Sequence, residues 1–239
     1  MKIDAFIFNW PRQFENTKIL EAQLSKVLDK VTVINSDDDN SLPHWVNIGN
    51  ESYFTAQFFK ALELFDGDVM FHIQADASHN DWQGIVSSAK DCFANNNCGI
   101  YAPNVDFTGW ISNRVDVKNV EPISNNLKHV TITDCTCWFI NKTIIEEFKS
   151  NLINCFTDNK YGYGIDITMS AISYNKKMQV IRDYNYTIQH PRGTAYNSLA
   201  ANQMMRDSFS KIKDPSIECI IQNIMIGANN KWFREEAFD

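Results

Sequence analysis

Strand-like and helix-like patterns alternate along the first hundred residues, and this alternation restricts the fold more than any other feature of the chain. Short apolar runs predict strands at residues 4–8, 31–35, 69–73 and 99–103. Between these runs, apolar side chains recur at helical spacing in the stretches 17–28, 54–65 and 82–93. Such a chain is expected to form an α/β fold, with a mostly parallel, Rossmann-like sheet sandwiched by helices, because right-handed crossovers join the strands.

Residue types at the helix starts predict where two of these helices begin. Asn16 or Thr17 precedes the apolar stripe of the first helix, and Asp81 precedes Trp82. Side chains of these types accept hydrogen bonds from the amides of a first helical turn. We therefore expect caps at these positions.

The second half of the chain is less regular. Residues 104–127 mix Asn, Ser, Asp and isolated aromatic residues over a stretch too long for an ordinary connection, which indicates a binding segment or disorder. Further strands are predicted at 129–133, 138–140, 178–181 and 186–190. Two amphipathic helices follow Tyr196. We expect residues 1–197 to form the α/β domain, and residues 198–239 a helical extension that packs on it or in a homodimer.

Charge and apolar content exclude several classes of partner. The formal net charge of −7 disfavours nucleic acid, since binding to a phosphate backbone requires clusters of basic residues. The sequence has no run of ~20 apolar residues to span a bilayer, and its start lacks the basic and apolar regions of a secretion signal. We expect a cytoplasmic protein without a transmembrane segment, whose six cysteines are reduced thiols or buried small apolar residues.

Polar residues follow the predicted strands at the point where each strand ends. Asp76 closes the tripeptide Gln74-Ala75-Asp76 after the third strand, and Asp37 and Asp38 follow the second. In open parallel sheets, ligands bind at the carboxyl ends of the strands. The alternative is structural, because an Asp after a strand often caps the next turn, and the polar run 37–40 also fits a solvated loop.

The order of these parts resembles that of the GT-A fold glycosyltransferases, family 2 in particular. Gln74-Ala75-Asp76 is similar to the Asp-x-Asp motif that ends the third strand in that family, with an amide in place of the first acid. Residues 162–166 resemble its Gly-x-x-Glu-Asp segment, with Ile165 in place of Glu. His190 matches a late histidine that often binds the metal. The similarity covers the layout of residues 1–197.

The resemblance implies a role for each candidate residue. Asp76 and His190 are expected to hold Mn²⁺ or Mg²⁺, and this donor pair suits Mn²⁺ better because Mg²⁺ prefers oxygen and water. Asp166 is expected to be the base that takes the acceptor's proton, with Asp134 in reserve. The expected donor contacts are Asn9, Asp37, Asp38, Gln74, Asp76 and Arg192. The expected acceptor contacts are Asp106, Trp110 and Tyr163.

Structural roles compete with three of these assignments. His190 also fits a strand-end histidine bonded to backbone, Asp166 a helix cap, and Trp110 a loop anchor. The predicted site is therefore a hypothesis about which side chains lie close together in the folded protein. It requires residues far apart in the sequence to meet at one edge of the sheet.

The resemblance implies an inverting, metal-assisted hexosyltransferase. It would move a sugar from a nucleotide-sugar donor to a glycan or lipid-linked acceptor, in bacterial-type surface polysaccharide or glycoconjugate synthesis. The alternative is a catalytically degenerate GT-A domain that binds a glycan or a partner, which Gln74 and Ile165 favour because they replace two acids. A nucleotidyltransferase fits less well, since residues 9–12 are not a Gly-rich, basic phosphate loop.

Overall fold

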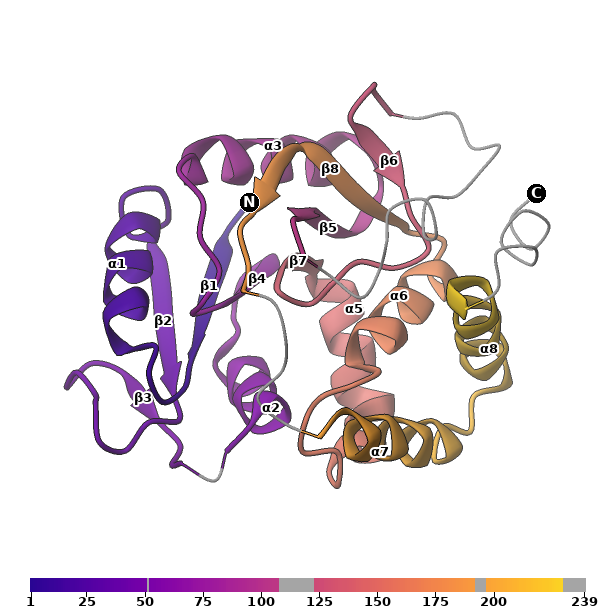
Figure 1. Ribbon diagram of the computed structural model, residues 1–239. Helices are drawn as coiled ribbons and strands as arrows, with labels where there is room; N and C mark the ends of the chain where they lie inside the picture. Colours follow the sequence, from indigo (N-terminus) through magenta and orange to yellow (C-terminus); the bar gives the residue numbers. More distant parts are fainter. Residues whose placement is uncertain (51, 108–122, 192–196, 230–239) are drawn as a thin grey trace.

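A computed structural model describes residues 1–50, 52–107, 123–191 and 197–229 (Figure 1). Its strands are β1 (Ile3–Asn9), β2 (Lys30–Asn35), β3 (Val46–Asn47), β4 (Val69–Gln74), β5 (Cys98–Val105), β6 (Leu127–His129), β7 (Cys137–Asn141) and β8 (Gln179–Ile188). Its α-helices are α1 (Phe14–Leu24), α2 (Phe54–Leu64), α3 (Trp82–Asn95), α5 (Lys142–Glu147), α6 (Ile165–Asn175), α7 (Ser198–Ser210) and α8 (Pro215–Asn229). A π-helical turn, η1 (Phe148–Leu152), and a 3₁₀ turn, η2 (Ile153–Phe156), follow α5.

Within the described residues the strands form one sheet in the order β3-β2-β1-β4-β7-β5-β8-β6. β1 pairs in parallel with β2 and β4, and β5 pairs in parallel with β8. The predicted α/β fold with a mostly parallel sheet is therefore confirmed. Two strands run the other way, because β7 lies antiparallel between β4 and β5, and β6 is antiparallel to β8.

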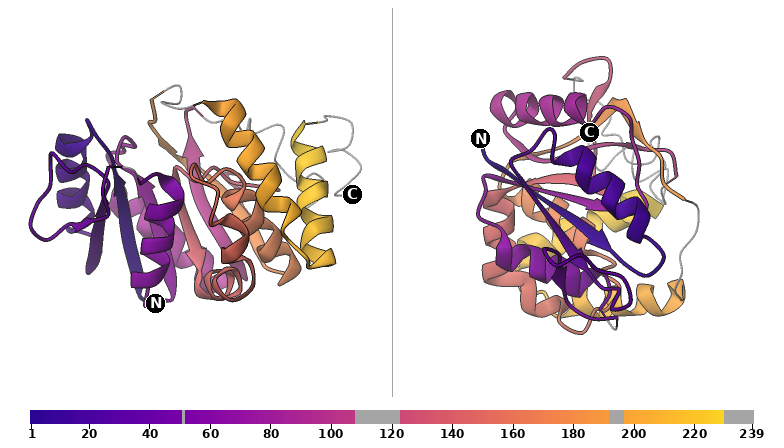
Figure 2. Two further views of the ribbon diagram at one scale, coloured as in Figure 1. Left: turned by 90° about the horizontal axis from the view of Figure 1, so that it is seen from below. Right: turned by 90° about the vertical axis from the view of Figure 1, so that its left-hand side faces the viewer.

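Helices cover both faces of the sheet (Figures 1 and 2). α1 and α3 pack on one face, where Phe71 of β4 is buried. α2, α5 and α6 cover the other face, where the neighbouring Met70 is buried. α8 packs against α6 and buries Ile217, Ile221 and Ile224 in the same cluster. The central strands are thus covered on both sides, which explains why their sequences are almost continuously apolar.

His72 is the one polar side chain in the apolar run of β4, and it is fully buried. Its ring lies 4.0 Å from the ring of Phe8 and 5.3 Å from that of Phe54, measured between centroids. Burial lowers the pKa of His72 to about 3, so the ring is neutral at physiological pH. A neutral imidazole packs here as an aromatic side chain.

Three expectations for the secondary structure need correction. α1 begins at Phe14 after Gln13, so Asn16 and Thr17 lie inside the helix and do not cap it. The strand expected at 129–133 ends at His129. The two strands expected near 178–181 and 186–190 are the single strand β8. The cap at Asp81 is confirmed, since its Oδ1 accepts from the Gly84 amide at 2.8 Å.

The continuity of β8 has a clear physical reason. Its polar residue Asp183 is fully buried, where a sequence pattern suggested an interruption. The carboxylate accepts hydrogen bonds from the Tyr101 hydroxyl at 2.7 Å and the Ser88 hydroxyl at 2.6 Å. A buried carboxylate paired in this way is compatible with a strand that continues past it, and the pairing of β8 with β5 shifts register between Asp183 and Thr187.

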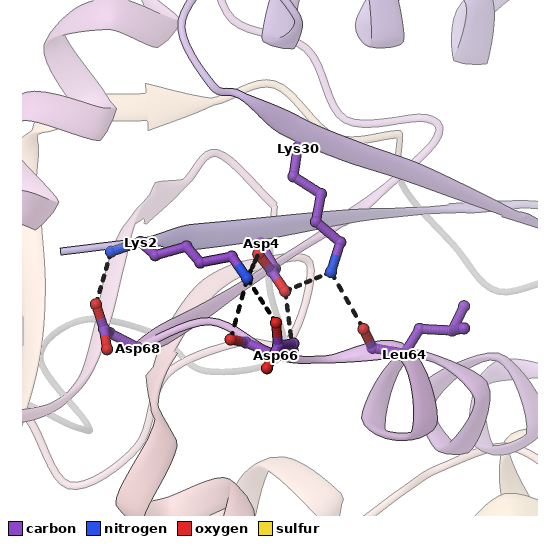
Figure 3. A network of polar contacts seen from close by, with 6 residues as sticks. All are labelled: Lys2, Asp4, Lys30, Leu64, Asp66 and Asp68. Carbon is purple, nitrogen blue, oxygen red and sulfur yellow. Dashed lines mark hydrogen bonds and ion pairs between the residues drawn. The ribbon is translucent and has the colours of Figure 1, made fainter.

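A network of charged residues closes the edge of the sheet where β1 and β4 begin (Figure 3). The buried Asp4 carboxylate lies 2.6 Å from the Lys30 ammonium and accepts from the Asp66 amide at 2.9 Å. The Lys2 ammonium binds the Asp66 carboxylate at 2.8 Å, and the Lys2 amide donates to Asp68 at 2.7 Å. Internal ion pairs therefore occupy this end of the sheet, which leaves the opposite end, where β1 and β4 finish, for a ligand site. Among the described helices, none is both long enough and apolar enough to cross a membrane.

Candidate functional site

The candidate site lies where β1, β2 and β4 end, at Asn9, Asn35 and Gln74. The Ala75 amide donates to the Phe8 carbonyl at 3.1 Å, which keeps the chain beside β1 as it leaves the strand. The Gln74 amide donates to the Thr136 carbonyl at 2.9 Å. Asp76 is therefore held at the carboxyl edge, beside the segment that leads into β7.

An isolated β-bridge brings the end of β8 to this edge. Ser78 and Gln189 exchange two backbone hydrogen bonds of 3.0 and 2.9 Å. His190 follows directly, and its amide donates to Asp106 Oδ1 at 2.8 Å. Its ring Nε2 lies 3.3 Å from Gln74 Oε1 and 3.5 Å from Asp76 Oδ1. We call Gln74, Asp76 and His190 the edge cluster.

Two polar atoms of the edge cluster are buried without a hydrogen-bond partner among the described residues, Asp76 Oδ1 and His190 Nδ1. The 3.5 Å contact between Asp76 and His190 is an ion-pair distance and too long for a good hydrogen bond. Desolvation raises the pKa of Asp76, and the nearby His190 partly opposes that rise. Since burying an unpaired carboxylate oxygen is costly, this arrangement is typical of a site that a ligand completes.

The raised pKa of Asp76 predicts a gain of stability on removing its charge. The folded protein binds this proton more tightly than the unfolded chain, so the free energy of unfolding falls as the pH rises through the pKa of Asp76. Asp76→Asn should therefore be more stable than the wild type at pH 7, by urea unfolding in buffer with a chelator. The difference should shrink as the pH falls toward the ordinary value of 3.8. A variant equally destabilised at both pH values would contradict this account.

The donor atoms of the edge cluster fit a divalent cation with open positions. No group of three or more His, Cys, Asp or Glu side chains that could hold a metal occurs in the described part of the chain. Asp76 and His190 supply two such donors, and Gln74 adds a neutral amide oxygen. One carboxylate, one imidazole and one amide oxygen suit Mn²⁺ better than Mg²⁺. The single negative charge makes further anionic oxygens from a ligand necessary for tight binding.

Glycines at 162 and 164 allow the chain to turn sharply before Asp166. Gly162 and Gly164 have φ of +77° and +90°, a region that side chains other than glycine rarely adopt. A Cβ on Gly162 would lie 2.2 Å from Phe54, and one on Gly164 would lie 2.8 Å from Met205 and Phe209. The loop is thus wedged between α2 and α7. Gly164 is the N-cap residue of α6, so Asp166 lies in the first turn and is not the cap.

Both acids predicted as bases lie near Cys135. Burial raises the pKa of the Cys135 thiol strongly, and the charges of Asp166 and Asp134 raise it further. Asp134 Oδ1 accepts from the amide of Thr136 at 2.8 Å and from its hydroxyl at 2.5 Å. The next carbonyl, that of Thr136, receives the Gln74 amide. These contacts place Asp166 and Asp134 beside the segment that flanks the edge cluster.

The first strand's predicted donor contact has a structural role instead. Asn9 is fully buried; its Oδ1 accepts from the Thr17 hydroxyl at 2.5 Å, and its Nδ2 donates to Asn35 Oδ1 at 2.5 Å. Both ends of the amide are therefore used within the protein. We leave Asn9 out of the donor site, because a ligand would have to break this network to reach it.

The acidic turn after β2 contains one buried and one exposed carboxylate. Asp37 is buried, and its two oxygens accept from the Asp39 amide and from Asn40 Nδ2, both at 3.1 Å. Asp38 is exposed and accepts from the Asn50 amide at 3.1 Å. Asp37 therefore shapes the turn, whereas Asp38 presents a carboxylate to solvent at the carboxyl edge.

Of the remaining predicted site residues, two lie within the described part of the chain and two lie outside it. Asp106 holds the His190 backbone, and Tyr163 lies half-buried in the glycine loop. Trp110 and Arg192 lie outside the described residues. Sequence reasoning missed Asn159, whose Nδ2 donates to the Tyr163 carbonyl at 2.8 Å and whose Oδ1 accepts from the Gly162 amide at 3.0 Å. An Asn just before two glycines was the available signal, since Asn commonly bonds to backbone in turns.

Comparison with solved structures identifies the fold. TarS of S. aureus matches with a TM-score of 0.60 and 11% sequence identity, over 100% of this chain and 74% of that one. A Pyrobaculum calidifontis mannosyltransferase, solved with GDP-Man and Mn²⁺, matches with a TM-score of 0.56 and 10% identity, over 98% of this chain and 72% of that one.

A third match is GalNAc-T7, solved with UDP, GalNAc and Mn²⁺. Its TM-score is 0.62 at 8% identity, over 99% of this chain and 54% of that one, so this chain spans about half of its length. The chain has the GT-A fold, and at these identities the likeness establishes the fold alone. No family model and no curated protein sequence matches the chain.

Proposed function

We propose that this protein is a glycosyltransferase that moves a sugar, with inversion, from a nucleotide-sugar donor to a glycan or lipid-linked acceptor. The observation that carries the proposal is the edge cluster, where Gln74, Asp76 and His190 meet with partnerless buried atoms. Its position at the carboxyl edge of a GT-A sheet is where a donor diphosphate would lie. We further propose a role in surface polysaccharide or glycoconjugate synthesis. The cytoplasmic location and the homodimer remain predictions.

A divalent metal held by Asp76 and His190, with Gln74 as a weak third donor, would neutralise the charge that develops on the departing diphosphate. The chain's own residues would do the rest. Asp38 would contact the nucleoside, and Asp166 would take the proton of the acceptor hydroxyl. The first turn of α6 holds the Asp166 carboxylate in place, since its Oδ1 accepts from the Ile167 amide at 2.9 Å. Asp134, bound by Thr136, would be the reserve base.

A screen of nucleotide sugars by thermal shift, with and without Mn²⁺, tests this function. A donor that binds only the folded protein raises the melting temperature by mass action, worth about 2.7 kcal/mol at 100 times its Kd. We expect at least one nucleotide sugar to stabilise the protein, with a larger shift in Mn²⁺. Product analysis of the anomeric configuration would then check inversion. If no nucleotide, nucleoside diphosphate or nucleotide sugar shifts the melting temperature, the proposal fails.

A binding module without catalysis is the second candidate. Gln74 removes one charge from the edge cluster, and Ile165, at the other acidic family position, is fully buried and apolar. A degenerate domain would bind donor or glycan without turnover. Hydrolysis of a stabilising nucleotide sugar, followed over hours, distinguishes a transferase from a binding module. Release of free sugar would show that the protein is an enzyme.

A further inference from the structure

A cavity of about 290 Å³ lies between residues 52–59 and residues 157–160. Residues at the start of α2 form one wall, and residues 157–160, which follow η2, form the other. The Thr55 hydroxyl donates to the Asn159 carbonyl, and Asn159 Nδ2 contacts the Ser208 hydroxyl of α7 at 3.1 Å. These hydrogen bonds join the two walls of the cavity to each other and to α7. None of the roles described above uses it.

Aromatic residues give the cavity an apolar side. Tyr53 and Phe59 both line it, and Tyr53 is 37% exposed. The Tyr53 ring is held in place by Tyr161, edge to face at 5.3 Å between centroids, and by the Lys160 ammonium, 4.0 Å from its centroid. A fixed, amphipathic ring of this kind is suited to the apolar face of a sugar.

Most of the polar groups that line the cavity act as hydrogen-bond acceptors, so they favour a ligand that donates hydrogen bonds. Ser52 Oγ already donates to the Ile48 carbonyl at 2.8 Å, and Thr157 Oγ1 to the Asn154 carbonyl at 3.2 Å. Together with Thr55, three of the four lining hydroxyl groups have used their protons and offer only lone pairs to a ligand; the fourth is the Tyr53 hydroxyl. The Asp158 carboxylate, which binds Lys211 at 2.7 Å, is an acceptor as well.

This donor and acceptor balance argues against an anionic ligand. A phosphate or carboxylate brings lone pairs and negative charge, and it would face acceptors and Asp158. Lys160 is the one cation among the described lining residues, and its ammonium lies over Tyr53. A neutral sugar supplies several hydroxyl protons and an apolar face, so it matches both sides of the cavity.

Asn159 joins the cavity to the loop that carries the proposed base. It lines the cavity, accepts from the Gly162 amide at 3.0 Å and donates to the Tyr163 carbonyl at 2.8 Å. Three residues after Tyr163 comes Asp166. We propose that the cavity binds a neutral sugar unit of the acceptor glycan, at a distance from the hydroxyl that reacts. This assignment rests on the proposed glycosyltransferase function.

Sugar binding without donor tests the assignment. The probes are free glucose, galactose, mannose, N-acetylglucosamine and lactose, with glucuronate and inorganic phosphate as anionic probes, followed by saturation-transfer NMR and titration. We expect a neutral sugar to bind and the anions not to bind. Ala56→Trp should abolish binding, because Ala56 is exposed on α2 and lines the cavity. Tyr53→Ala should weaken binding about tenfold.

Tyr53→Phe is the matched control and should keep most of the affinity, since the ring remains. The Tyr53 side chain makes no capping bond to α2, so these changes should leave the helix intact. Binding of uridine or guanosine diphosphate with Mn²⁺ should be unchanged in all three variants. If no neutral sugar binds, or if Ala56→Trp binds as the wild type does, the cavity assignment is overturned while nucleotide binding still supports the function. Sugar binding without any nucleotide binding overturns the acceptor role together with the proposed function.

Discussion

Replacing Asp76 by asparagine is expected to abolish the metal-dependent binding of nucleoside diphosphates while the protein stays folded. Asp76 is the only carboxylate in the edge cluster, since Gln74 is neutral and His190 binds metal as a neutral ring. Mutating a residue that only orients a metal ligand typically lowers metal affinity 10- to 100-fold. Removing a ligand itself should cost more, so we expect the affinity to fall about 100-fold or more. Calorimetric titration of uridine and guanosine diphosphate, each with and without Mn²⁺, measures the effect.

The neighbouring residue provides a test in the opposite direction. Gln74→Glu adds a second acid of nearly the same shape, and the present Gln74 Oε1 lies 3.3 Å from the His190 ring Nε2. The added charge should strengthen Mn²⁺ binding about tenfold or more. If Asp76→Asn binds Mn²⁺ and diphosphate as the wild type does, and Gln74→Glu gains no Mn²⁺ affinity, the edge cluster is not a metal site.

An Asp166→Asn variant is expected to lose about 10²- to 10⁴-fold in kcat, the usual contribution of a positioned base, while its donor affinity stays unchanged. Asparagine has nearly the same shape and keeps an oxygen for the Ile167 amide, which the Asp166 carboxylate now binds at 2.9 Å. The start of α6 should therefore keep its conformation. Turnover of the donor found in the screen, together with donor titration, separates chemistry from binding.

Asp134→Asn is the matched control for Asp166→Asn, because both acids lie near Cys135. Asp134 already accepts two hydrogen bonds from Thr136, so replacing its carboxylate should lower turnover much less than Asp166→Asn does. Equal losses in the two variants would point to a shared electrostatic effect. A larger loss for Asp134→Asn would exchange the roles of base and reserve. Unchanged turnover of Asp166→Asn removes Asp166 from the mechanism.

The carboxyl-edge position of Asp76 was predictable because it depends on local pattern. A covered apolar strand, a crossover helix before it and a polar stop after it are all encoded within a few turns of chain. The position of His190 beside Gln74 and Asp76 could not be predicted from local sequence pattern. Gln74 and His190 are 116 residues apart, and the Ser78–Gln189 bridge that joins their segments has no local sequence signal.

The role of Asn9 shows a second limit of sequence reasoning. Its place at the end of β1 suggested a ligand contact, but Thr17 on α1 turns inward and binds its amide. Whether a polar side chain at a strand end faces a ligand or the protein depends on the helix packed beside it. The direction of β7 is a third case, since a strand buried on both faces has the same apolar pattern whether it is parallel or antiparallel.

The position of β7 also determines the order in which the sheet can be completed during synthesis. β3, β2, β1 and β4 are neighbours in the sheet and all come from the first 74 residues, so they can pair as soon as they leave the ribosome. β5 is made next, but its partners in the sheet, β7 and β8, come later in the chain. A nascent chain that stops before Cys137 therefore leaves β5 unpaired and one side of β4 open. We therefore expect the nascent chain to be most prone to aggregation at that stage, because unpaired strands can pair with other chains.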